Sequence, residues 1–455
     1  MQSKTTLVAF VALVLFLSAV PPARAQGGGD AADPRLERAA ALISTDRIAE
    51  AEQQLASILK AKPEDPHAIN LLGAVRDKQG RLDEAEALFT RALRADRDFA
   101  GAHMNLAYLY LLKGAPGKTV EELREVHRLV PEDADAGYKL AHLLLTLGRL
   151  DECVAFVEGE RQSNRLTPPL LAVVGDAYLK KGDAPKAEES YRAALEAQGD
   201  NADALLGMAL VSQSKGDAQS ASLYLSRVKP LAANSPDLLY RFGVAALRSD
   251  RFEDARSALE AALRLSPEEP SYFVALGAVW LKQPDIFEAE RQFRQALKLQ
   301  PDNAPAQMYL GYTLLKQKKL PEAREWLEKS AKGDANAPET FYYLGLIAQE
   351  QNEDERAVEL FSKSVRLLPS FAGAHIALGS VYLKLKDYAR ARAELEAGVR
   401  LKPDDSKAHY NLARLYALLK EPQRAQAEMA IVERLKNSGK AQSQEGDIGA
   451  PSSPR

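Results

Sequence analysis

Small and large apolar residues alternate along this chain in a pattern that repeats every 34 residues without insertion or deletion. Twelve residues before the reference position of each unit another Gly or Ala recurs, as at Gly73 and Gly277. Four residues after the reference position most units have a large apolar residue, such as Phe89 or Phe293. The apolar residues follow helical spacing twice in each unit, with a short turn between, so the pattern predicts one helix hairpin per unit. The reference positions are Ala51, Ala85, Thr119, Cys153, Ala187, Ala221, Ala255, Ala289, Ala323, Ala357, Ala391 and Ala425.

A fixed period of this length is typical of a solenoid, in which each unit buries its apolar face only against its neighbours. Gly or Ala on the first helix and Ala on the second allow the two backbones to approach closely, while Leu and Phe fill the space to the next unit. Pro301 and Pro403 are two of the prolines that close many units, and proline cannot continue a helix. We therefore expect a chain that is mostly a surface for holding a partner.

The repeated residues resemble the tetratricopeptide repeat, whose pattern is W-x2-L-G-x2-Y, then A-x3-F, then P. The same phase is kept from about residue 32 to about residue 436, although the first Trp of the pattern is absent throughout. The resemblance implies an all-α fold, a right-handed superhelical solenoid of about twelve helix hairpins, with the first helix of each hairpin on the concave face. In residues 270–303 the match is Phe273, Leu276, Gly277, Trp280, Ala289, Phe293, Ala296 and Pro301.

The first 25 residues differ from the repeats. Lys4 precedes an uncharged apolar run from Leu7 to Val20, and small residues at Ala23 and Ala25 stand just before Gln26. This order predicts a secretory signal peptide over residues 1–25, cleaved near Ala25, and hence an exported protein in the periplasm or outside the cell. An uncleaved N-terminal anchor remains the alternative. Residues 26–33 form a polar leader.

The repeat array is expected to span residues 34–436, with one break in its pattern. Glu160 stands where other repeats have Ile, Ala or Val, and Gly159 lies inside the expected second helix. Gly costs about 1 kcal/mol relative to Ala within a helix, so residues 158–167 are expected to hold a shortened helix or a hinge. The tail 437–455 is rich in Ser, Gly, Gln and Pro and is predicted to be disordered.

Composition narrows the possible functions. The chain has 60 basic and 63 acidic residues, a net charge of −3, and so lacks the basic surface typical of nucleic-acid binders. Cys153 is the only cysteine, which excludes an intrachain disulfide. It stands at a reference position, where a thiol replaces Ala as a small packing residue.

Catalytic patterns are absent from the sequence. It has no H-E-x-x-H, no G-x-S-x-G and no G-x-x-x-x-G-K-[ST], so we predict a protein that is not an enzyme and needs no cofactor. His375 and His409 occupy equivalent positions of adjacent repeats, but they recur because the repeat recurs, and the position normally packs into the interior. No metal site is predicted.

The resemblance places ligand-facing residues on the first helices. Two consecutive repeats supply Tyr309, Tyr312, Tyr342 and Tyr343 at those positions, together with Met308 and Leu346, and tyrosine suits binding surfaces. The alternative is that these tyrosines are tolerated on half-buried helices. A second patch near the N-terminus contains Tyr108, Tyr138 and Lys139. Neither an asparagine ladder nor the carboxylate clamp of chaperone-binding relatives is supplied by the sequence.

The leading hypothesis is a non-catalytic exported scaffold that binds an extended peptide or partner protein in its groove, in envelope assembly or secretion. The second is an accessory protein of polysaccharide export or synthesis, because the family includes such proteins and aromatic rings can stack on sugars. An envelope enzyme is disfavoured by the missing motifs. The partner and the oligomeric state are left open by the sequence.

Overall fold

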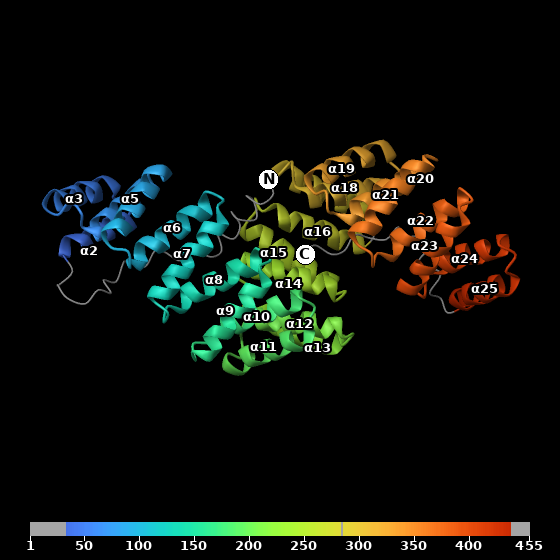
Figure 1. The fold of residues 1–455 in the computed structure, drawn as a ribbon, viewed down its shortest axis with the longest axis horizontal. Coiled ribbons are helices and arrows are strands. Elements are labelled where there is room, and N and C mark those ends of the chain that lie inside the picture. Colours follow the sequence, from blue (N-terminus) through green and yellow to red (C-terminus); the bar gives the residue numbers. More distant parts are fainter. Residues whose placement is uncertain (1–32, 284, 438–455) are drawn as a thin grey trace. The chain divides into compact units, whose positions relative to one another are not determined.

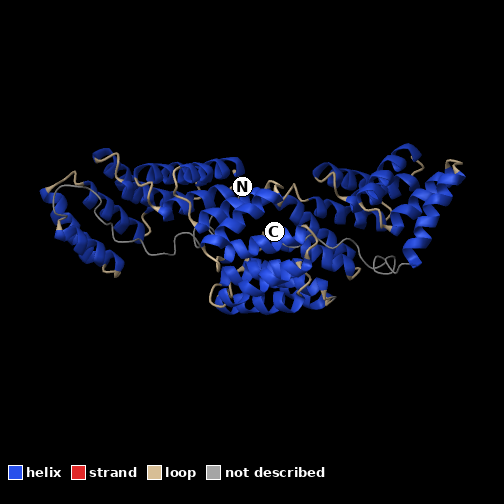
Figure 2. Ribbon diagram, turned by 90° about the horizontal axis from the view of Figure 1, so that it is seen from below, coloured by secondary structure: helices blue, strands red, loops and turns tan. Residues whose placement is uncertain are grey.

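The computed structural model describes residues 33–283 and 285–437. These residues form helices joined by short loops, without a strand among them (Figure 2). The all-α fold expected from the 34-residue period is confirmed. The predicted signal peptide over residues 1–25, residues 26–32 of the leader and residues 438–455 of the tail lie outside the described residues.

The chain divides into two compact units, Met1–Val228 and Lys229–Arg455. Figure 1 labels their helices and colours the ribbon along the sequence. In unit 1 the helices are α2 (Pro34–Ser44), α3 (Ile48–Ala61), α4 (Pro66–Lys78), α5 (Leu82–Ala95), α6 (Ala100–Leu112), α7 (Pro116–Leu129), α8 (Ala134–Thr146), α9 (Leu150–Gln162), α10 (Pro168–Lys180), α11 (Ala184–Ala197) and α12 (Ala202–Ser214), followed by α13 (Ala218–Leu231), within which the boundary falls. In unit 2 they are α14 (Pro236–Arg248), α15 (Phe252–Leu265), α16 (Pro270–Lys282), α17 (Ile286–Leu299), α18 (Ala304–Lys316), α19 (Leu320–Gly333), α20 (Pro338–Glu350), α21 (Asp354–Leu367), α22 (Ala372–Lys384), α23 (Tyr388–Leu401), α24 (Ser406–Leu418) and α25 (Pro422–Asn437).

Each hairpin packs a large side chain of its second helix against a Gly or Ala of its first helix. A Cβ atom on Gly73 of α4 would lie 2.5 Å from the Phe89 ring of α5. The same distance would separate Gly345 of α20 from the Phe361 ring of α21. Only a residue without a side chain permits these contacts, so the small positions in the sequence are explained by ring packing.

The turns inside the hairpins α4–α5, α8–α9, α18–α19 and α22–α23 share a left-handed backbone residue at the same repeat position. Glycine supplies it at Gly80 and Gly148, where φ is 73° and 71°. Lys318 and Lys386 adopt φ of 61° and 63° at the equivalent positions, which is strained for a residue with a side chain. These residues are the turns that the sequence predicted between the two apolar runs.

The core of unit 2 is continuous from hairpin to hairpin, whereas the buried apolar residues of unit 1 fall into several smaller clusters. In unit 2 one apolar cluster extends from Ala246 to Tyr416 and contains the first-helix leucines and the second-helix rings. Because each helix pair buries its faces against the pairs before and after it, the stack is a repeat architecture rather than a single globular core.

The break in the pattern is visible at α9, which has 13 residues where α7 and α11 have 14. Gly159 lies inside α9, and Asn164 in the loop that follows has a φ of 57°. The helix is thus shorter by one residue, while a hinge at residues 158–167 stays a prediction. The division into compact units falls elsewhere, between Val228 and Lys229.

No helix within the described ranges is both long and apolar enough to cross a membrane. The longest, α25, has 16 residues.

Candidate functional site

Consecutive first helices of unit 2 carry a set of tyrosines that we call the tyrosine cluster. Each of these helices has proline at its first or second position, where the fixed φ of proline favours the start of a helix, and apolar residues at helical spacing follow. The cluster comprises Tyr240 on α14, Tyr272 on α16, Tyr309 and Tyr312 on α18, and Tyr342 and Tyr343 on α20.

The rings of the cluster contact one another between neighbouring hairpins. Tyr240 stacks on Tyr272 with 5.1 Å between ring centroids, and Tyr312 meets Tyr343 at 4.9 Å. Tyr309 stacks on the Phe293 ring of α17 at 5.2 Å. Such offset and tilted pairs contribute roughly 0.5–1.5 kcal/mol each beyond area burial, so the cluster stiffens the first-helix side of unit 2.

The phenol groups of Tyr240, Tyr309 and Tyr343 have raised pKa values. Burial raises the pKa of Tyr240 to about 12, and the carboxylates of Asp237 and Glu269 act in the same direction. Burial also raises the pKa of Tyr309 and Tyr343 above the usual range for tyrosine, with Glu339 nearby in both cases. These hydroxyl groups can therefore donate and accept hydrogen bonds without taking a charge.

The four tyrosines predicted to line a groove are mostly buried. The exposed fractions of Tyr309, Tyr312, Tyr342 and Tyr343 are 3, 2, 8 and 0%. All four belong to the apolar core cluster of unit 2. The structure thus brings them together, as expected, while their role in binding stays a prediction.

One member of the cluster and two side chains beside it expose more surface. Met308 on α18 and Leu346 on α20 are partly exposed, as is Tyr240 on α14. The sequence analysis did not single out Tyr240. Tyr240 stands 68 residues, or two repeats, before Met308 and so occupies the same position of the 34-residue repeat. The repeat positions used for α18 and α20 would therefore have identified it on α14.

The second predicted patch lies on α6 and α8 of unit 1. Tyr108 and Tyr138 are half-buried, and burial raises the pKa of Tyr108. Lys139 is buried, and its Nζ atom lies 2.5 Å from Oδ2 of Asp135. Lys139 is therefore engaged within its own helix, and a binding role for the three residues remains a prediction.

An amide pair joins two first helices of unit 1. The Nδ2 atom of Asn105 on α6 donates to Oδ1 of Asn70 on α4 over 2.9 Å. Asn70 is buried, and its partner is half-buried. Asn70 stands one position earlier in its repeat than Asn105, so the 34-residue period did not bring the two residues together in the sequence analysis. Two residues do not make the asparagine ladder of some relatives.

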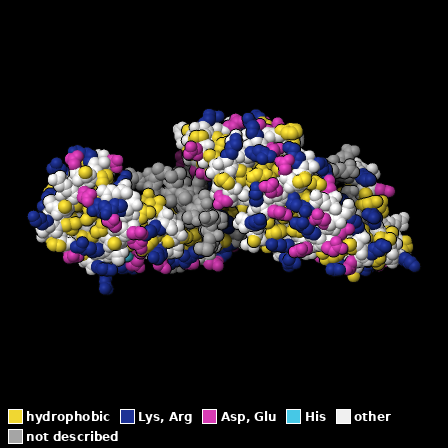
Figure 3. Space-filling view, turned by 90° about the horizontal axis from the view of Figure 1, so that it is seen from above, with side chains coloured by type: hydrophobic (Ala, Val, Ile, Leu, Met, Phe, Trp, Pro, Cys, Tyr) yellow, Lys and Arg dark blue, Asp and Glu magenta, His cyan; other side chains and the backbone are white. Residues whose placement is uncertain are grey.

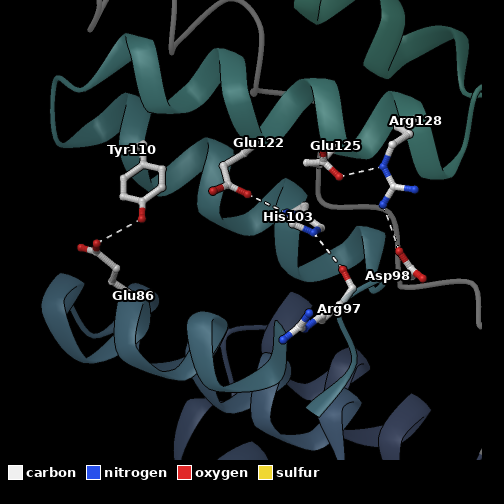
Figure 4. Close-up of polar contacts among 8 residues, drawn as sticks. All are labelled: Glu86, Arg97, Asp98, His103, Tyr110, Glu122, Glu125 and Arg128. Atoms are coloured by element: carbon white, nitrogen blue, oxygen red, sulfur yellow. Dashed lines mark hydrogen bonds and ion pairs between the residues drawn. The ribbon is translucent and has the colours of Figure 1, made fainter. Parts of the chain in front are cut away.

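Histidine at the fourth position of a repeat joins the two helices of its hairpin. The Nδ1 atom of His103 on α6 lies 2.6 Å from a carboxylate oxygen of Glu122 on α7, and Nε2 lies 3.2 Å from the carbonyl oxygen of Arg97 (Figure 4). Both partners are acceptors, so a ring protonated on both nitrogens satisfies them. Glu122 raises the pKa of His103, against the opposing effect of burial.

The same arrangement recurs twice in unit 2. His375 pairs with Glu394 at 2.6 Å, and His409 pairs with Glu428 at 2.5 Å. Both histidines are buried, as the sequence analysis expected from their repeat position. Each of these histidines contacts one carboxylate and one backbone carbonyl oxygen. These contacts join the two helices of a hairpin and hold the fold together. In the described part of the chain no group of three or more His, Cys, Asp or Glu side chains is placed to hold a metal ion.

A buried charge cluster occupies the break in the repeat pattern. Glu160 on α9 accepts hydrogen bonds from Arg165, and its Oε1 atom lies 3.1 Å from Nε2 of His127 on α7. Burial alone would raise the pKa of Glu160, but Arg165 and His127 together hold it below the usual value. The cluster borders an open cleft of about 220 Å³ between the loops before α8 and α10. The unexpected Glu at this position is thus explained by its contacts with Arg165 and His127.

The surface in Figure 3 carries Lys and Arg side chains interspersed with Asp and Glu, and apolar side chains lie between them. This mixture fits the near-neutral composition. It provides no extended field of one sign that would attract a polyanion.

The model of the tetratricopeptide repeat family matches residues 36–97, 70–118 and 376–438. The model described as the C-terminal domain of cilia and flagella-associated protein 70 matches residues 155–341. Among solved structures, one titled as the APC/C hetero-tetramer Cut9-Hcn1 superposes with a TM-score of 0.56 at 16% identity, covering 94% of this chain and 84% of that one. At this identity the likeness shows the fold alone.

The relatives found by sequence similarity are proteins C of cellulose synthase operons. Cellulose synthase operon protein C of Xanthomonas axonopodis pv. citri is 27% identical over 49% of this chain, and that of Pseudomonas fluorescens is 22% identical over 52%. The cellulose synthase 1 operon protein C of Komagataeibacter xylinus is 25% identical over 47% of this chain. The matched regions span 13, 23 and 14% of these three relatives, so each relative is much longer than the match.

Proposed function

Because this chain belongs to the tetratricopeptide repeat proteins, we propose that it is a non-catalytic scaffold that binds an extended peptide or a partner protein along its first helices. The observation that carries the proposal is the tyrosine cluster of unit 2. Four consecutive first helices, α14, α16, α18 and α20, carry a stiff aromatic layer. Within it Tyr240 is partly exposed, and partly exposed Met308 and Leu346 lie beside it. A surface that is ordered before binding loses less conformational entropy when a partner docks.

A more specific form of the proposal places the partner in polysaccharide synthesis or export. Four curated relatives are named for cellulose synthase operons, which favours an accessory role of that kind. In this form the scaffold would hold a protein of the synthesis or export apparatus, or the polysaccharide itself.

The proposal includes export to the periplasm or the cell exterior. It rests on the apolar run from Leu7 to Val20 and the small residues at Ala23 and Ala25, which are typical of a secretory signal peptide. N-terminal sequencing of the exported form tests it, with Gln26 expected as the first residue. An intact Met1 in a membrane fraction would establish an anchor instead.

No catalytic residue, metal or cofactor is assigned to the chain in this proposal. Support comes from the use of the histidines and the cysteine as packing and hydrogen-bonding residues within the hairpins. Nucleic acid is not proposed as a partner, since the chain is slightly acidic.

The test is affinity capture from an envelope extract with wild-type protein and a Tyr240→Ala plus Met308→Ala variant. Both side chains are partly exposed, so the variant is expected to keep its helical circular dichroism and to lose the captured partner. Leu223→Ala is the matched control, because Leu223 is an exposed apolar residue on the second helix α13.

Capture of a peptide or envelope protein supports the scaffold. Capture of a synthase or export component, or retention of the protein on a cellulose matrix, supports the polysaccharide form. Undiminished capture by the double variant would exclude the first helices of unit 2 as the site.

A further inference from the structure

The last hairpin of unit 2, formed by α24 and α25, exposes a side chain that every earlier hairpin buries. Met429 stands at the repeat position of Leu395, and its exposed fraction is 37% where that of Leu395 is 0%. The ten equivalent residues before Leu395 are 0–2% exposed: Leu55, Phe89, Leu123, Val157, Tyr191, Leu225, Leu259, Phe293, Leu327 and Phe361. In every earlier repeat this position is therefore buried.

The neighbouring hairpin supplies this cover everywhere else in unit 2. Leu395 of α23 lies in the apolar cluster that also contains Leu412 and Leu415 of α24. After α25 no further helix follows among the described residues. In the described part of the chain, the side of α24 and α25 at the position of a next first helix is exposed, as Met429 and Tyr410 show; these helices lie at one end of the ribbon in Figure 1.

Two helical stripes form this surface, which we call the end face. Tyr410 is 47% exposed, whereas Ile376 and Tyr342 at its position in the two preceding hairpins are buried. Ala417 is likewise exposed where Leu383 is buried. The end face comprises Lys407, Tyr410, Arg414 and Ala417 on α24, and Pro422, Gln426, Met429, Ala430 and Glu433 on α25. The spacings of three and four residues place each set on one side of its helix.

The opposite end of the repeat array has a different chemistry. The exposed residues of α2 include Arg35, Glu37, Arg38 and Ser44, and no large apolar side chain of α2 or α3 is strongly exposed. A polar outer face is what a terminal repeat needs for solubility. Docking of the α2 end of one copy onto the end face of another would therefore bury charges against apolar residues.

The composition of residues 438–455 offers little apolar surface. Residues 438–455 contain a single large apolar residue, Ile448, among Ser, Gly, Gln, Pro and charged residues. Burial of Tyr410 and Met429 requires apolar partner surface, which this composition does not supply.

Charges on the end face are complementary to a second copy of the same surface. Lys407 and Arg414 lie on the α24 stripe, and Glu433 lies on the α25 stripe. A two-fold axis that sets α24 of one protomer on α25 of its partner brings basic residues opposite an acidic one, twice, around paired Tyr410 and Met429 side chains. We propose that the end face is a two-fold dimer interface between copies of this chain.

The test is the molar mass of the purified full chain by sedimentation and light scattering across a dilution series. Wild-type protein is expected to form a dimer that dissociates on dilution, and Met429→Glu is expected to raise the dimer dissociation constant at least tenfold, about the effect of losing one central contact. Leu418→Glu is the matched control. Leu418 is exposed on α24, and the equivalent Lys384 of the preceding hairpin is exposed as well. A following hairpin therefore does not cover this position, and Leu418 lies outside the end face. Its substitution should leave the dimer intact.

A charge exchange tests the two-fold arrangement itself. Glu433→Arg should weaken the dimer by repulsion from Lys407 and Arg414, and the additional changes Lys407→Glu and Arg414→Glu should restore it. Tyr410→Ser, at a second exposed site, repeats the apolar test if the Met429 variant fails to fold by circular dichroism. A wild-type monomer at every concentration, or a dimer unaffected by both apolar substitutions, overturns the proposal. The proposal is also overturned if the chain is a monomer and its end face is covered only when a different protein binds.

Discussion

The aromatic ring of Phe293 packs directly on the backbone of Gly277, so that a Cβ atom at Gly277 would lie 2.5 Å from Cε1 of the ring. Phe293 is fully buried between the two helices of its hairpin, and it cannot withdraw without leaving a cavity. The glycine therefore sets the distance between α16 and α17.

Gly277→Ala is expected to destabilise unit 2 by roughly 1–3 kcal/mol, the usual cost of overpacking a buried contact. Chemical denaturation followed by circular dichroism measures it. Gly159→Ala is the matched comparison. A Cβ there would meet no atom within 4 Å, so the substitution should stabilise α9 by about 1 kcal/mol through helix propensity alone. Equal effects of the two substitutions would refute the packing argument.

Much of this geometry could be predicted from the sequence, because residues of similar size recur at the same position in successive repeats. The small residue at Gly277 and the large one at Phe293 recur at fixed spacing, and the hairpins follow from them. The burial of Tyr309 and Tyr343 could not be read in the same way, since a first-helix position can face either the groove or the neighbouring hairpin. Only the contacts of their rings decide between these possibilities.

The charged residues show the same limit. Glu160 interrupts an apolar position, and the sequence analysis could identify the interruption but not its partners. Arg165 is five residues away in a loop, and His127 belongs to the preceding hairpin, so their meeting depends on the fold. Met429 shows the reverse case, in which a residue follows the repeat pattern and is exposed because no described helix covers it.

Lys386→Gly is expected to stabilise unit 2 by about 1 kcal/mol. Lys386 has a φ of 63°, a left-handed conformation that costs an L-residue roughly 1–2 kcal/mol and costs glycine nothing, and the greater flexibility of unfolded glycine offsets part of the gain. The reciprocal substitution Gly148→Lys, at a φ of 71°, should destabilise unit 1 by a similar amount. Denaturation midpoints of both variants give the measurement, and a loss of stability in Lys386→Gly would contradict the strain assigned to this turn.

Cys153 is expected to be unreactive in the folded protein. Burial raises the pKa of its thiol to about 12, and its Sγ atom lies against the carbonyl oxygen of Ala141 at 3.4 Å. Since the thiolate is the reactive form, a thiol reagent at neutral pH should modify the native chain very slowly and the unfolded chain within minutes. Rapid modification of native protein would indicate that α9 opens locally, which would also favour the predicted hinge.

The contact between His103 and Glu122 should make the stability of unit 1 depend on pH. Because the folded state raises the pKa of His103, its contribution to stability is complete below the unfolded value of 6.5 and is lost as the pH rises through the folded value. The variant His103→Gln should therefore lose more stability relative to wild type at about pH 6 than at about pH 9. Glu122→Gln, which removes the carboxylate, should abolish the same pH dependence. If the stability of the wild type and of the variants changes by the same amount between these two pH values, the assignment is wrong.

Tyr343→Ala and Tyr240→Ala are expected to separate stability from binding. Tyr343 is fully buried against Tyr312 and Tyr342, so its truncation should cost about 3–5 kcal/mol, the range for a large aromatic residue in a core. Tyr240 is half-buried and stacks on one ring, so its truncation should cost clearly less stability and more affinity for a partner. Thermal melts and affinity capture of the two variants provide the comparison. If Tyr343→Ala melts like wild type and Tyr240→Ala binds like wild type, the tyrosine cluster is neither a core nor a docking surface, and the binding face must be sought on the α6 and α8 patch around Tyr108 and Tyr138.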